Sequence, residues 1–518
     1  MLSKRVIKSA STIRIASTHR SASSTNESEK CFIRLDKSFN NTEQAFKCKT
    51  NADLLRSLVV FQLCSNNFLV QNNDKILHIV RKLLGQKLFE KVLRGTFYGH
   101  FVAGATRSEV RSVVDKMKDY NVQSLIGKNI EADLSYIEDK NAKKKAPKPI
   151  AEMEKESDKN AAILCDSLDD VSEVSYGDGF TAIKLTALGR PELLLKLSDF
   201  INEYRGLFKV LTDTKTNSLV GKTLNYDDFL GKIQNKIDHG KAKDLFQLVD
   251  KDGDQVVDLH DWDELINLQL ELNPVLNTKQ GDKLLTHVLT KDEIKEFSNM
   301  KQRIEHIANH ANRKQVRVII DAEQTYFQPA ISRFATDLME KYNKGRAQIL
   351  NTYQAYLKNT YNWKRAAQFG YEDPVNPTYE ATTDSYHRCL LRILDELDNR
   401  GAEHVSLLIA GHNEDTVRFA VQQLKDRGID PNSRNVCFGQ LYGMCDHITF
   451  CLGQAGYRVY KYIPYGPVDE VIPYLSRRAV ENGAIFEKLS KERGLLWKEL
   501  KRRFTQGGNS SGAVPNIV

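Results

Sequence analysis

From about residue 120, short β-branched or apolar runs alternate with stretches whose hydrophobic residues recur at helical spacing. This alternation is typical of βα units that build a parallel sheet. The runs occupy residues 122–126, 182–186, 316–320, 349–355, 405–410, 436–440 and 459–463. We therefore expect an α/β fold of the (β/α)8-barrel type that is incomplete, because seven runs leave it one strand short.

Two further regions lie outside this alternation. Residues 52–93 carry apolar positions at helical spacing, which predicts an N-terminal helical segment. The interval from Thr186 to Val316 is too long for a single βα connection, so a second structural unit is inserted there.

The insertion contains a pattern typical of an EF-hand loop at residues 250–261. Oxygen ligands fall at loop positions 1, 3, 5, 7, 9 and 12, supplied by Asp250, Asp252, Asp254, the Val256 carbonyl, Asp258 and Asp261. Gln255 stands where the sharp turn favours glycine, at a cost of about 1 kcal/mol. Asp261 is one methylene shorter than the usual glutamate. We therefore predict weak Ca²⁺ or Mg²⁺ binding, with only a degraded second hand around residues 225–228.

The formal net charge is +8, but residues 1–30 hold six Lys/Arg against two Glu and so supply half of it. Their Ser, Thr, Arg and Lys content, with no acidic residue before Glu27, is typical of a mitochondrial transit peptide.

The rest of the composition argues against several other classes of protein. The chain has no basic patch interleaved with aromatics that would favour nucleic acid as a partner. No apolar segment reaches the roughly 18 residues of a membrane span. The eight cysteines lack metal or disulfide spacing and are interpreted as reduced thiols.

Candidate chemistry is concentrated at residues 474–482. As a helix, this segment places Tyr474, Arg477, Arg478 and Glu481 on one face, at spacings of 0, 3, 4 and 7. Two neighbouring guanidinium groups can clamp a small carboxylate through paired, charge-assisted hydrogen bonds. The alternative is a solvated helix face with an internal Glu/Arg pair. The helix follows the run at 459–463, so it lies past the carboxyl end of a strand, where barrel enzymes act.

Over most of residues 95–504 the chain resembles the proline dehydrogenases, flavoenzymes of mitochondria and bacteria. The resemblance rests on eight motifs in one order, at residues 99–104, 181–188, 320–323, 352–356, 370–379, 410–413, 439–444 and 474–482. It implies FAD-dependent oxidation of L-proline to 1-pyrroline-5-carboxylate, with electrons passed to quinone and peripheral association with the matrix side of the mitochondrial inner membrane. Oxidation of 4-hydroxyproline is the alternative, since a few pocket contacts distinguish one hydroxyl group.

The resemblance also implies roles for individual residues. Arg477 and Arg478 bind the substrate carboxylate, Tyr460 and Tyr474 wall the proline ring, and Lys184 and Asp321 act near the flavin and substrate. The cofactor contacts are Gln354, His412, Asn413 and Glu481. The alternatives are a snorkelling Lys184, an Asp321 that caps the next helix, and a His412 that merely neighbours a helix cap.

The chain departs from the family between Tyr356 and Gly370, where only 13 residues stand and residues 359–369 contain no β-run. We predict that the fifth strand is missing, together with an arginine that contacts the flavin. A second hypothesis is therefore a catalytically impaired isoform that acts as a Ca²⁺-responsive interaction protein.

The expected organisation has five parts. They are a transit peptide (1–30), an N-terminal helical segment (31–118), a proline dehydrogenase barrel (119–204 and 306–505), an EF-hand-like helical insert (205–305) and a disordered tail (506–518).

Overall fold

A computed structural model describes residues 33–128, 149–177, 179–215, 219, 221–233, 236–250, 252–268, 285–357, 375–401, 404–484 and 486–505. The expected transit peptide (1–30), the tail (506–518) and the segment 358–374 lie outside these residues. None of the helices described is both long and apolar enough to cross a membrane.

The central element is a sheet of seven parallel strands in the order β6-β5-β2-β1-β9-β8-β7. Every predicted run forms one of these strands: β1 (Val122–Gly127), β2 (Phe180–Ile183), β5 (Arg317–Ile320), β6 (Ile349–Asn351), β7 (Leu407–Ala410), β8 (Val436–Leu441) and β9 (Val459–Pro464). The first and last strands pair along their whole length, from Val122 with Val459 to Gly127 with Pro464.

This pairing of β1 with β9 is the closure that a (β/α)8 barrel requires. Among the described strands, β6 pairs only with β5 and β7 only with β8. As far as the described residues go, the barrel is therefore open between β6 and β7, where the sequence predicts the missing strand. The prediction of an incomplete α/β barrel is confirmed.

Each strand divides its side chains between two cores. On β5, Val318 and Ile320 belong to the large core beneath the surrounding helices, whereas Ile319 belongs to a small cluster inside the barrel with Leu125 and Leu350. Successive side chains of a strand point to opposite faces, so a run that is apolar throughout is buried on both sides.

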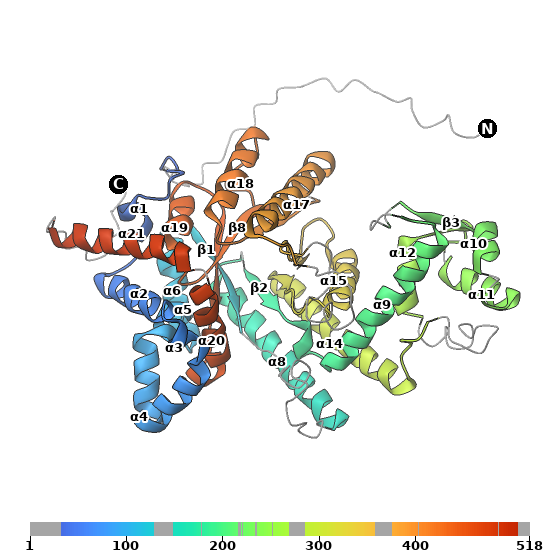
Figure 1. Ribbon diagram of the computed structural model, residues 1–518, viewed down its shortest axis with the longest axis horizontal. Helices are drawn as coiled ribbons and strands as arrows, with labels where there is room; N and C mark the ends of the chain where they lie inside the picture. The colour runs from blue at the N-terminus through green and yellow to red at the C-terminus, as the bar shows by residue number, and fades with distance from the viewer. Residues whose placement is uncertain are drawn as a thin grey trace.

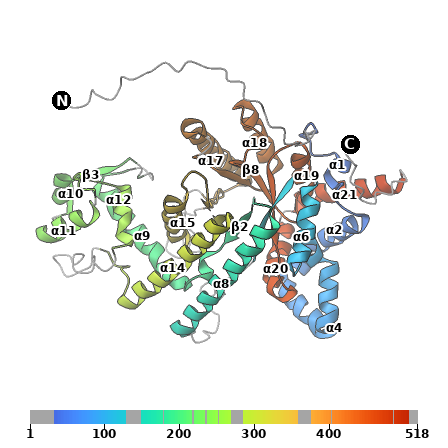
Figure 2. The ribbon, with the colours of Figure 1, turned by 180° about the vertical axis from the view of Figure 1, so that it is seen from behind.

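Helices cover the outer face of the sheet (Figures 1 and 2). They are α8 (Ile150–Val174), α9 (Pro191–Leu211), α14 (Lys291–Lys314), α15 (Gln328–Tyr342), α17 (Tyr379–Arg400), α18 (Glu414–Asp426) and α19 (Asp446–Gln454). Several begin at caps that the sequence supplies. At α14, for example, Thr290 and Glu293 form a capping box that satisfies exposed backbone N–H groups.

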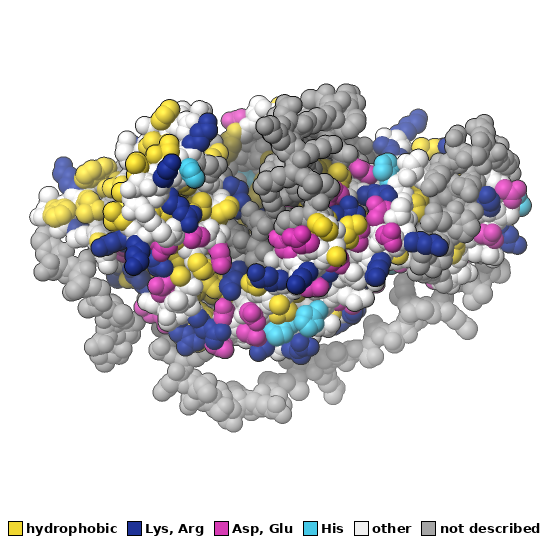
Figure 3. Space-filling model, turned by 90° about the horizontal axis from the view of Figure 1, so that it is seen from below, with side chains coloured by type: hydrophobic (Ala, Val, Ile, Leu, Met, Phe, Trp, Pro, Cys, Tyr) yellow, Lys and Arg dark blue, Asp and Glu magenta, His cyan; other side chains and the backbone are white. Residues whose placement is uncertain are grey.

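The predicted N-terminal helical segment is confirmed, but it is broken into several pieces. They are α1 (Thr42–Phe46), α2 (Asn51–Cys64), α3 (Asn67–Gln71), α4 (Asn73–Gly95), α5 (Phe97–Phe101) and α6 (Arg107–Lys118). Asn66 caps α3, and Gly85, at a φ of 70°, kinks α4. Helices α1 to α5 pack on α20 (Val468–Ala484) or α21 (Phe486–Thr505), whereas α6 packs on β1 and α8. Figure 3 shows hydrophobic and basic side chains interspersed at this end of the molecule.

The insertion between β2 and β5 lies at the opposite end of the molecule (Figure 1). After the 3-10 turn η1 (Leu185–Ala187) and α9, it contains β3 (Thr223–Asn225), α10 (Tyr226–Ile233), α11 (His239–Val249), β4 (Val256–Asp258), α12 (Leu259–Asp263) and η2 (Glu264–Ile266). Leu224 of β3 pairs with Val257 of β4. The expected insert boundaries at 204/205 and 305/306 fall within α9 and α14, so continuous helices join the insert to the barrel.

Candidate active site at the carboxyl ends of the strands

Lys184 and Asp321 directly follow β2 and β5. These strands pair in register, and the Asp321 N–H donates to the Ile183 carbonyl over 2.9 Å, so both side chains lie at one level of the rim. The Lys184 Nζ is 3.3 Å from the Asp321 Oδ2. Asp321 does not cap the next helix, because the N-cap of α15 is Phe327. The structure therefore brings these two predicted residues together.

Glu323 adds a second carboxylate to this rim. It accepts hydrogen bonds from the Thr186 N–H over 3.2 Å and from the Thr186 Oγ1 over 2.6 Å. Burial raises the pKa of Glu323, and the positive charge of Lys184 opposes this effect. Our interpretation of the sequence missed Glu323, although it closes the motif that begins at Ile320. The shifted pKa and the cationic neighbour are typical of a functional site.

Gln354 lies three residues beyond β6 and faces the same rim. Its Nε2 donates to the Glu323 carbonyl over 3.0 Å, whereas its Oε1 is buried and has no hydrogen-bond partner among the described residues. An unsatisfied buried acceptor costs about 1 to 3 kcal/mol, so this oxygen is suited to an N–H group of a bound ligand. The imide N–H of a flavin ring fits this requirement.

His412 and Asn413 follow β7. The His412 Nε2 accepts from the Leu441 N–H over 3.1 Å, so its proton resides on Nδ1. The Asn413 Oδ1 accepts from the Asp415 N–H over 3.0 Å and caps α18, while its Nδ2 donates to the Thr383 Oγ1 over 3.2 Å. Both residues thus hold the loop at the end of β7 in place, whatever contacts they make to a cofactor.

The predicted arginine helix is α20. Tyr474 is buried in a cluster formed by α2, α4, α5 and α20, and the Arg478 guanidinium carbon lies 4.9 Å from the centre of its ring. Arg477 and Arg478 are half-buried. The side chain of Glu481 lies outside the described part of the structure. The helical placement of the pair is confirmed, and its role toward a carboxylate stays a prediction.

Tyr460 does not lie at this rim. It is fully buried inside the barrel, where its hydroxyl accepts from Arg317 Nη2 over 3.1 Å and its ring meets Phe180 edge-on at 5.0 Å. Arg317 and Phe180 begin their strands, so this layer is at the amino end of the sheet. Tyr462 lies on the same face two residues later and contacts both the barrel interior and the α20 cluster. Tyr462 is therefore better placed than Tyr460 to wall a substrate.

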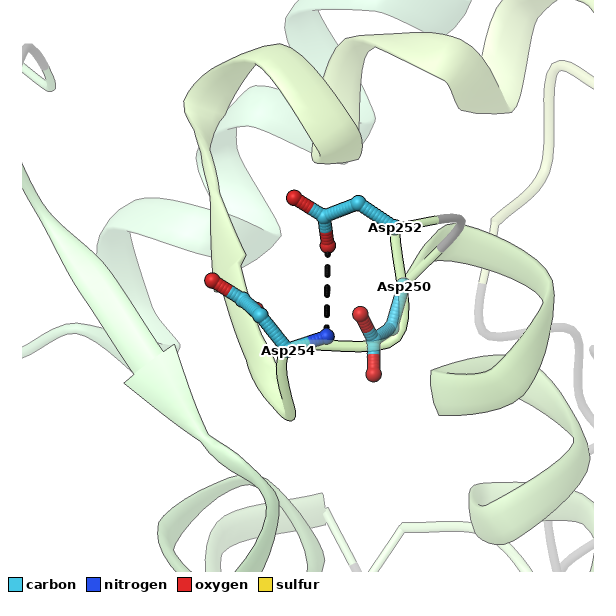
Figure 4. Close-up of side chains that lie close together, drawn as sticks. All are labelled: Asp250, Asp252 and Asp254. Atoms are coloured by element: carbon cyan, nitrogen blue, oxygen red, sulfur yellow. Dashed lines mark hydrogen bonds between the residues drawn. The ribbon is translucent and has the colours of Figure 1, made fainter.

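The EF-hand-like loop gathers only part of its expected ligand set. Oxygens of Asp250, Asp252 and Asp254 lie within 4.8 Å of one another (Figure 4). Gln255 adopts a φ of 64°, the conformation for which position 6 favours glycine. Asp258 and Asp261 instead form a capping box at the start of α12, and the Val256 N–H donates to the Asp254 Oδ1 over 2.8 Å.

Two of the eight motifs, at 99–104 and 439–444, line a cavity of about 390 Å³ outside the barrel, between the N-terminal helices and β9. Its buried charges are paired, since Asp446 lies 2.9 Å from the Lys49 Nζ and 2.8 Å from the Lys461 Nζ. Gly443 adopts a φ of 79°, and any Cβ there would collide with the His100 carbonyl. These motifs therefore pack the N-terminal helices onto the barrel.

The fold and rim together define a barrel enzyme with charged and amide groups at the carboxyl ends of its strands. A proline dehydrogenase family model matches residues 237–363 and 360–491. The chain is 44% identical to proline dehydrogenase 1, mitochondrial, of Caenorhabditis elegans, over 94% of this chain and 92% of the relative. It is 36% identical to the Homo sapiens protein of that name, over 90% of each chain. The chain belongs to the proline dehydrogenase family.

Two more distant matches complete the comparison. Hydroxyproline dehydrogenase of Xenopus laevis is 31% identical over 88% of each chain. The crystal structure of proline utilization A from Bdellovibrio bacteriovorus, inactivated by N-propargylglycine, is 15% identical with a TM-score of 0.48. That match covers 86% of this chain but 38% of the other.

Proposed function

We propose that this protein is a mitochondrial, FAD-dependent proline dehydrogenase that oxidises L-proline to 1-pyrroline-5-carboxylate. The observation that carries the proposal is the 44% identity to a mitochondrial proline dehydrogenase over nearly the whole of both chains. Two groups of side chains support the proposal: the rim residues Lys184, Asp321 and Gln354, and the arginine pair beyond β9. Residues 1–30 act as the transit peptide, and the product is released on the matrix side of the inner membrane.

The side chains of this chain bind and orient the substrate. Arg477 and Arg478 bind the proline carboxylate with forked, charge-assisted hydrogen bonds, and Tyr474 and Tyr462 wall the ring. Lys184, held by Asp321, adds a further positive charge at the rim. The ring carbon next to nitrogen then loses a hydride and the nitrogen loses a proton, which leaves the C=N bond of the product. Holding the ring in one orientation converts a collision into a positioned transfer.

FAD supplies the two-electron acceptor, a chemistry that no side chain provides. The residues present fit it, because the buried Gln354 Oε1 has no donor among the described residues and can accept from the cofactor. Asn413 and Glu481 complete the proposed cofactor contacts. The electrons then pass to quinone, which requires peripheral contact with the inner membrane.

L-Proline is favoured over 4-hydroxyproline because the proline dehydrogenase relatives are 36–44% identical and the hydroxyproline dehydrogenases only 31–32%.

For the insert, we propose weak binding of Ca²⁺ or Mg²⁺ by Asp250, Asp252, Asp254 and the Val256 carbonyl, with Asp258 and Asp261 recruited from the α12 capping box. The alternative function is that of a catalytically impaired isoform that responds to Ca²⁺ through this loop.

The direct test is the flavin spectrum of the purified protein. We expect a yellow protein whose flavin absorbance is bleached by L-proline without oxygen, with pyrroline trapped by o-aminobenzaldehyde. A colourless protein would favour the impaired isoform, and a flavin bleached faster by 4-hydroxyproline would reverse the choice of substrate.

A further inference from the structure

Helix α4 exposes an unusual concentration of large hydrophobic side chains. Eighteen such residues are exposed in the described part of the chain, and eight of them lie between residues 55 and 92. Five are on α4 itself: Ile79, Leu83, Leu84, Leu88 and Val92. Leu83, at 78% exposure, is the most exposed of the eighteen. Clustered exposed apolar residues mark an interaction surface, whereas scattered ones do not.

In both halves of α4 the exposed apolar residues stand beside lysines. Before the kink at Gly85, Lys75, Ile79 and Leu83 follow one another at four-residue intervals, so they share a face. After the kink, the row formed by Leu88 and Val92 runs alongside the row formed by Lys87 and Lys91. An apolar stripe bordered by lysines is the pattern of a helix that lies in a membrane interface.

The charge of this surface is strongly one-sided. Residues 73–95 contain six Lys/Arg against two acidic residues. Arg81 pairs with Asp469 and Arg94 with Glu109, whereas Lys75, Lys82, Lys87 and Lys91 are exposed. A basic surface of this kind is complementary to anionic phospholipid headgroups, each lysine near such a surface contributing about 1 kcal/mol.

The opposite face of α4 packs against α20, the helix that carries Tyr474 and the arginine pair. Phe89 and Leu93 are buried in the cluster that contains Tyr474. The Gln86 Nε2 donates to Asp469 at the start of α20 over 3.1 Å. Whatever α4 binds is therefore held against the helix that carries the arginine pair. Figure 1 places α4 at an outer corner of the molecule, where a flat surface can reach it.

We propose that α4 is the surface by which this protein docks on an anionic phospholipid bilayer, with its apolar row at the acyl boundary and its lysines on headgroup phosphates. The inference rests on the proposed function in one respect, because a quinone acceptor dissolved in the membrane gives docking its purpose. Helix α21 also exposes Trp497 and Phe504, but its Arg503 is engaged with the Phe46 and Lys49 carbonyls. The exposed face of α21 therefore serves as the control surface for α4 in the binding experiment.

The test is flotation of the full chain with vesicles of phosphatidylcholine, with and without phosphatidylglycerol. We expect binding only to the anionic vesicles, and weaker binding as salt rises. The double variant Lys82→Gln/Lys87→Gln should lower the partition coefficient roughly 25-fold, from about fivefold for each lysine. Leu83→Gln/Leu88→Gln should lower it about tenfold or more. The matched control Val210→Gln/Lys243→Gln, on the exposed surface of the insert, should bind as the wild type does.

Three outcomes overturn the proposal: no binding of the wild type to anionic vesicles, normal binding by both α4 variants, or loss of binding only in Trp497→Gln/Phe504→Gln. A fall in solution mass of the α4 variants with unchanged vesicle binding would also overturn it, and would identify a contact between copies of the chain. Reduction of a water-soluble dye by proline is measured on the same samples. If the wild type does not reduce the dye with proline, the proposed function is contradicted. Vesicle binding is a separate measurement, so that result leaves the docking proposal to be decided by flotation.

Discussion

The Lys184 Nζ lies 3.3 Å from the Asp321 Oδ2, and this ion pair joins the ends of two adjacent barrel strands. The side chains are 23% and 38% exposed, so the pair contributes at most about 1 kcal/mol to stability. Its importance lies in orientation. Asp321 holds the lysine at the rim, within electrostatic reach of Glu323, where we propose that the substrate binds.

Asp321→Asn should therefore impair catalysis far more than folding. The amide keeps the shape of the side chain but removes the charge that positions Lys184, and we expect kcat/KM for proline to fall roughly 10- to 100-fold. The melting temperature should change little. Steady-state kinetics and thermal melts check this. The control is Glu305→Gln, which breaks the exposed pair with Lys341 far from the rim and should leave both measurements unchanged.

Arg477→Met should raise the apparent KM for proline while bound flavin is retained. The substitution removes a charge partner of the substrate carboxylate worth about 2 to 4 kcal/mol, or roughly 30- to 800-fold. Kinetics and the flavin-to-protein absorbance ratio separate the two effects, with Arg493→Met on α21 as the matched control. If Arg477→Met loses flavin and keeps its KM, then α20 faces the cofactor and our assignment of the clamp is wrong.

The strands were predictable because most of their residues are apolar and buried, as Val318, Ile319 and Ile320 of β5 are after Arg317. Depth along a strand was not predictable. Alternation assigns Tyr460 and Tyr462 to the same face, but only the contact between Tyr460 and Arg317, the first residue of β5, shows that the Tyr460 side chain lies away from the carboxyl-end rim. The kink at Gly85 was also missed, because apolar spacing continues across it.

The docking of α21 should weaken as pH rises. His447 of α19 is buried, with its Nε2 3.0 Å from a Glu414 oxygen and its Nδ1 3.8 Å from Glu492 of α21. Burial lowers the pKa of His447, but the two carboxylates outweigh burial and raise it to about 9. A pKa raised in the folded state adds stability that is complete below about pH 6.5 and is lost as pH rises through about 9.

The raised pKa of His447 adds up to about 3 kcal/mol to the free energy of unfolding. Thermal melts at about pH 6.5 and about pH 9.5 should show a loss of stability in the wild type that is much smaller in His447→Gln. His260→Gln, at an exposed position of the insert, should follow the wild type. Equal pH dependence in the wild type and His447→Gln would mean that His447 is not charged in the folded protein.

Gln255→Gly should strengthen ion binding by the insert. Gln255 holds a φ of 64°, which costs a residue with a side chain about 1 kcal/mol more than glycine. Calorimetry on the full chain should find weak Ca²⁺ binding in the wild type, roughly fivefold tighter binding in Gln255→Gly, and none in Asp250→Asn/Asp252→Asn. A sub-micromolar affinity in the wild type would show that Gln255 and Asp261 are compatible with a strong site.

The opening between β6 and β7 should limit the activity of this chain. A βα unit needs roughly 25 residues or more, and the 13 residues between Tyr356 and Gly370 cannot supply a strand, a return helix and a flavin-contacting arginine. Replacing this segment with the longer one of a close relative should raise flavin occupancy and turnover together, because strand and arginine are restored at once. An insert of equal length built from Gly and Ser is the control and should restore neither. If the unmodified chain already binds stoichiometric FAD and reduces it with proline, the missing strand is dispensable, and the open edge of β6 is compatible with catalysis.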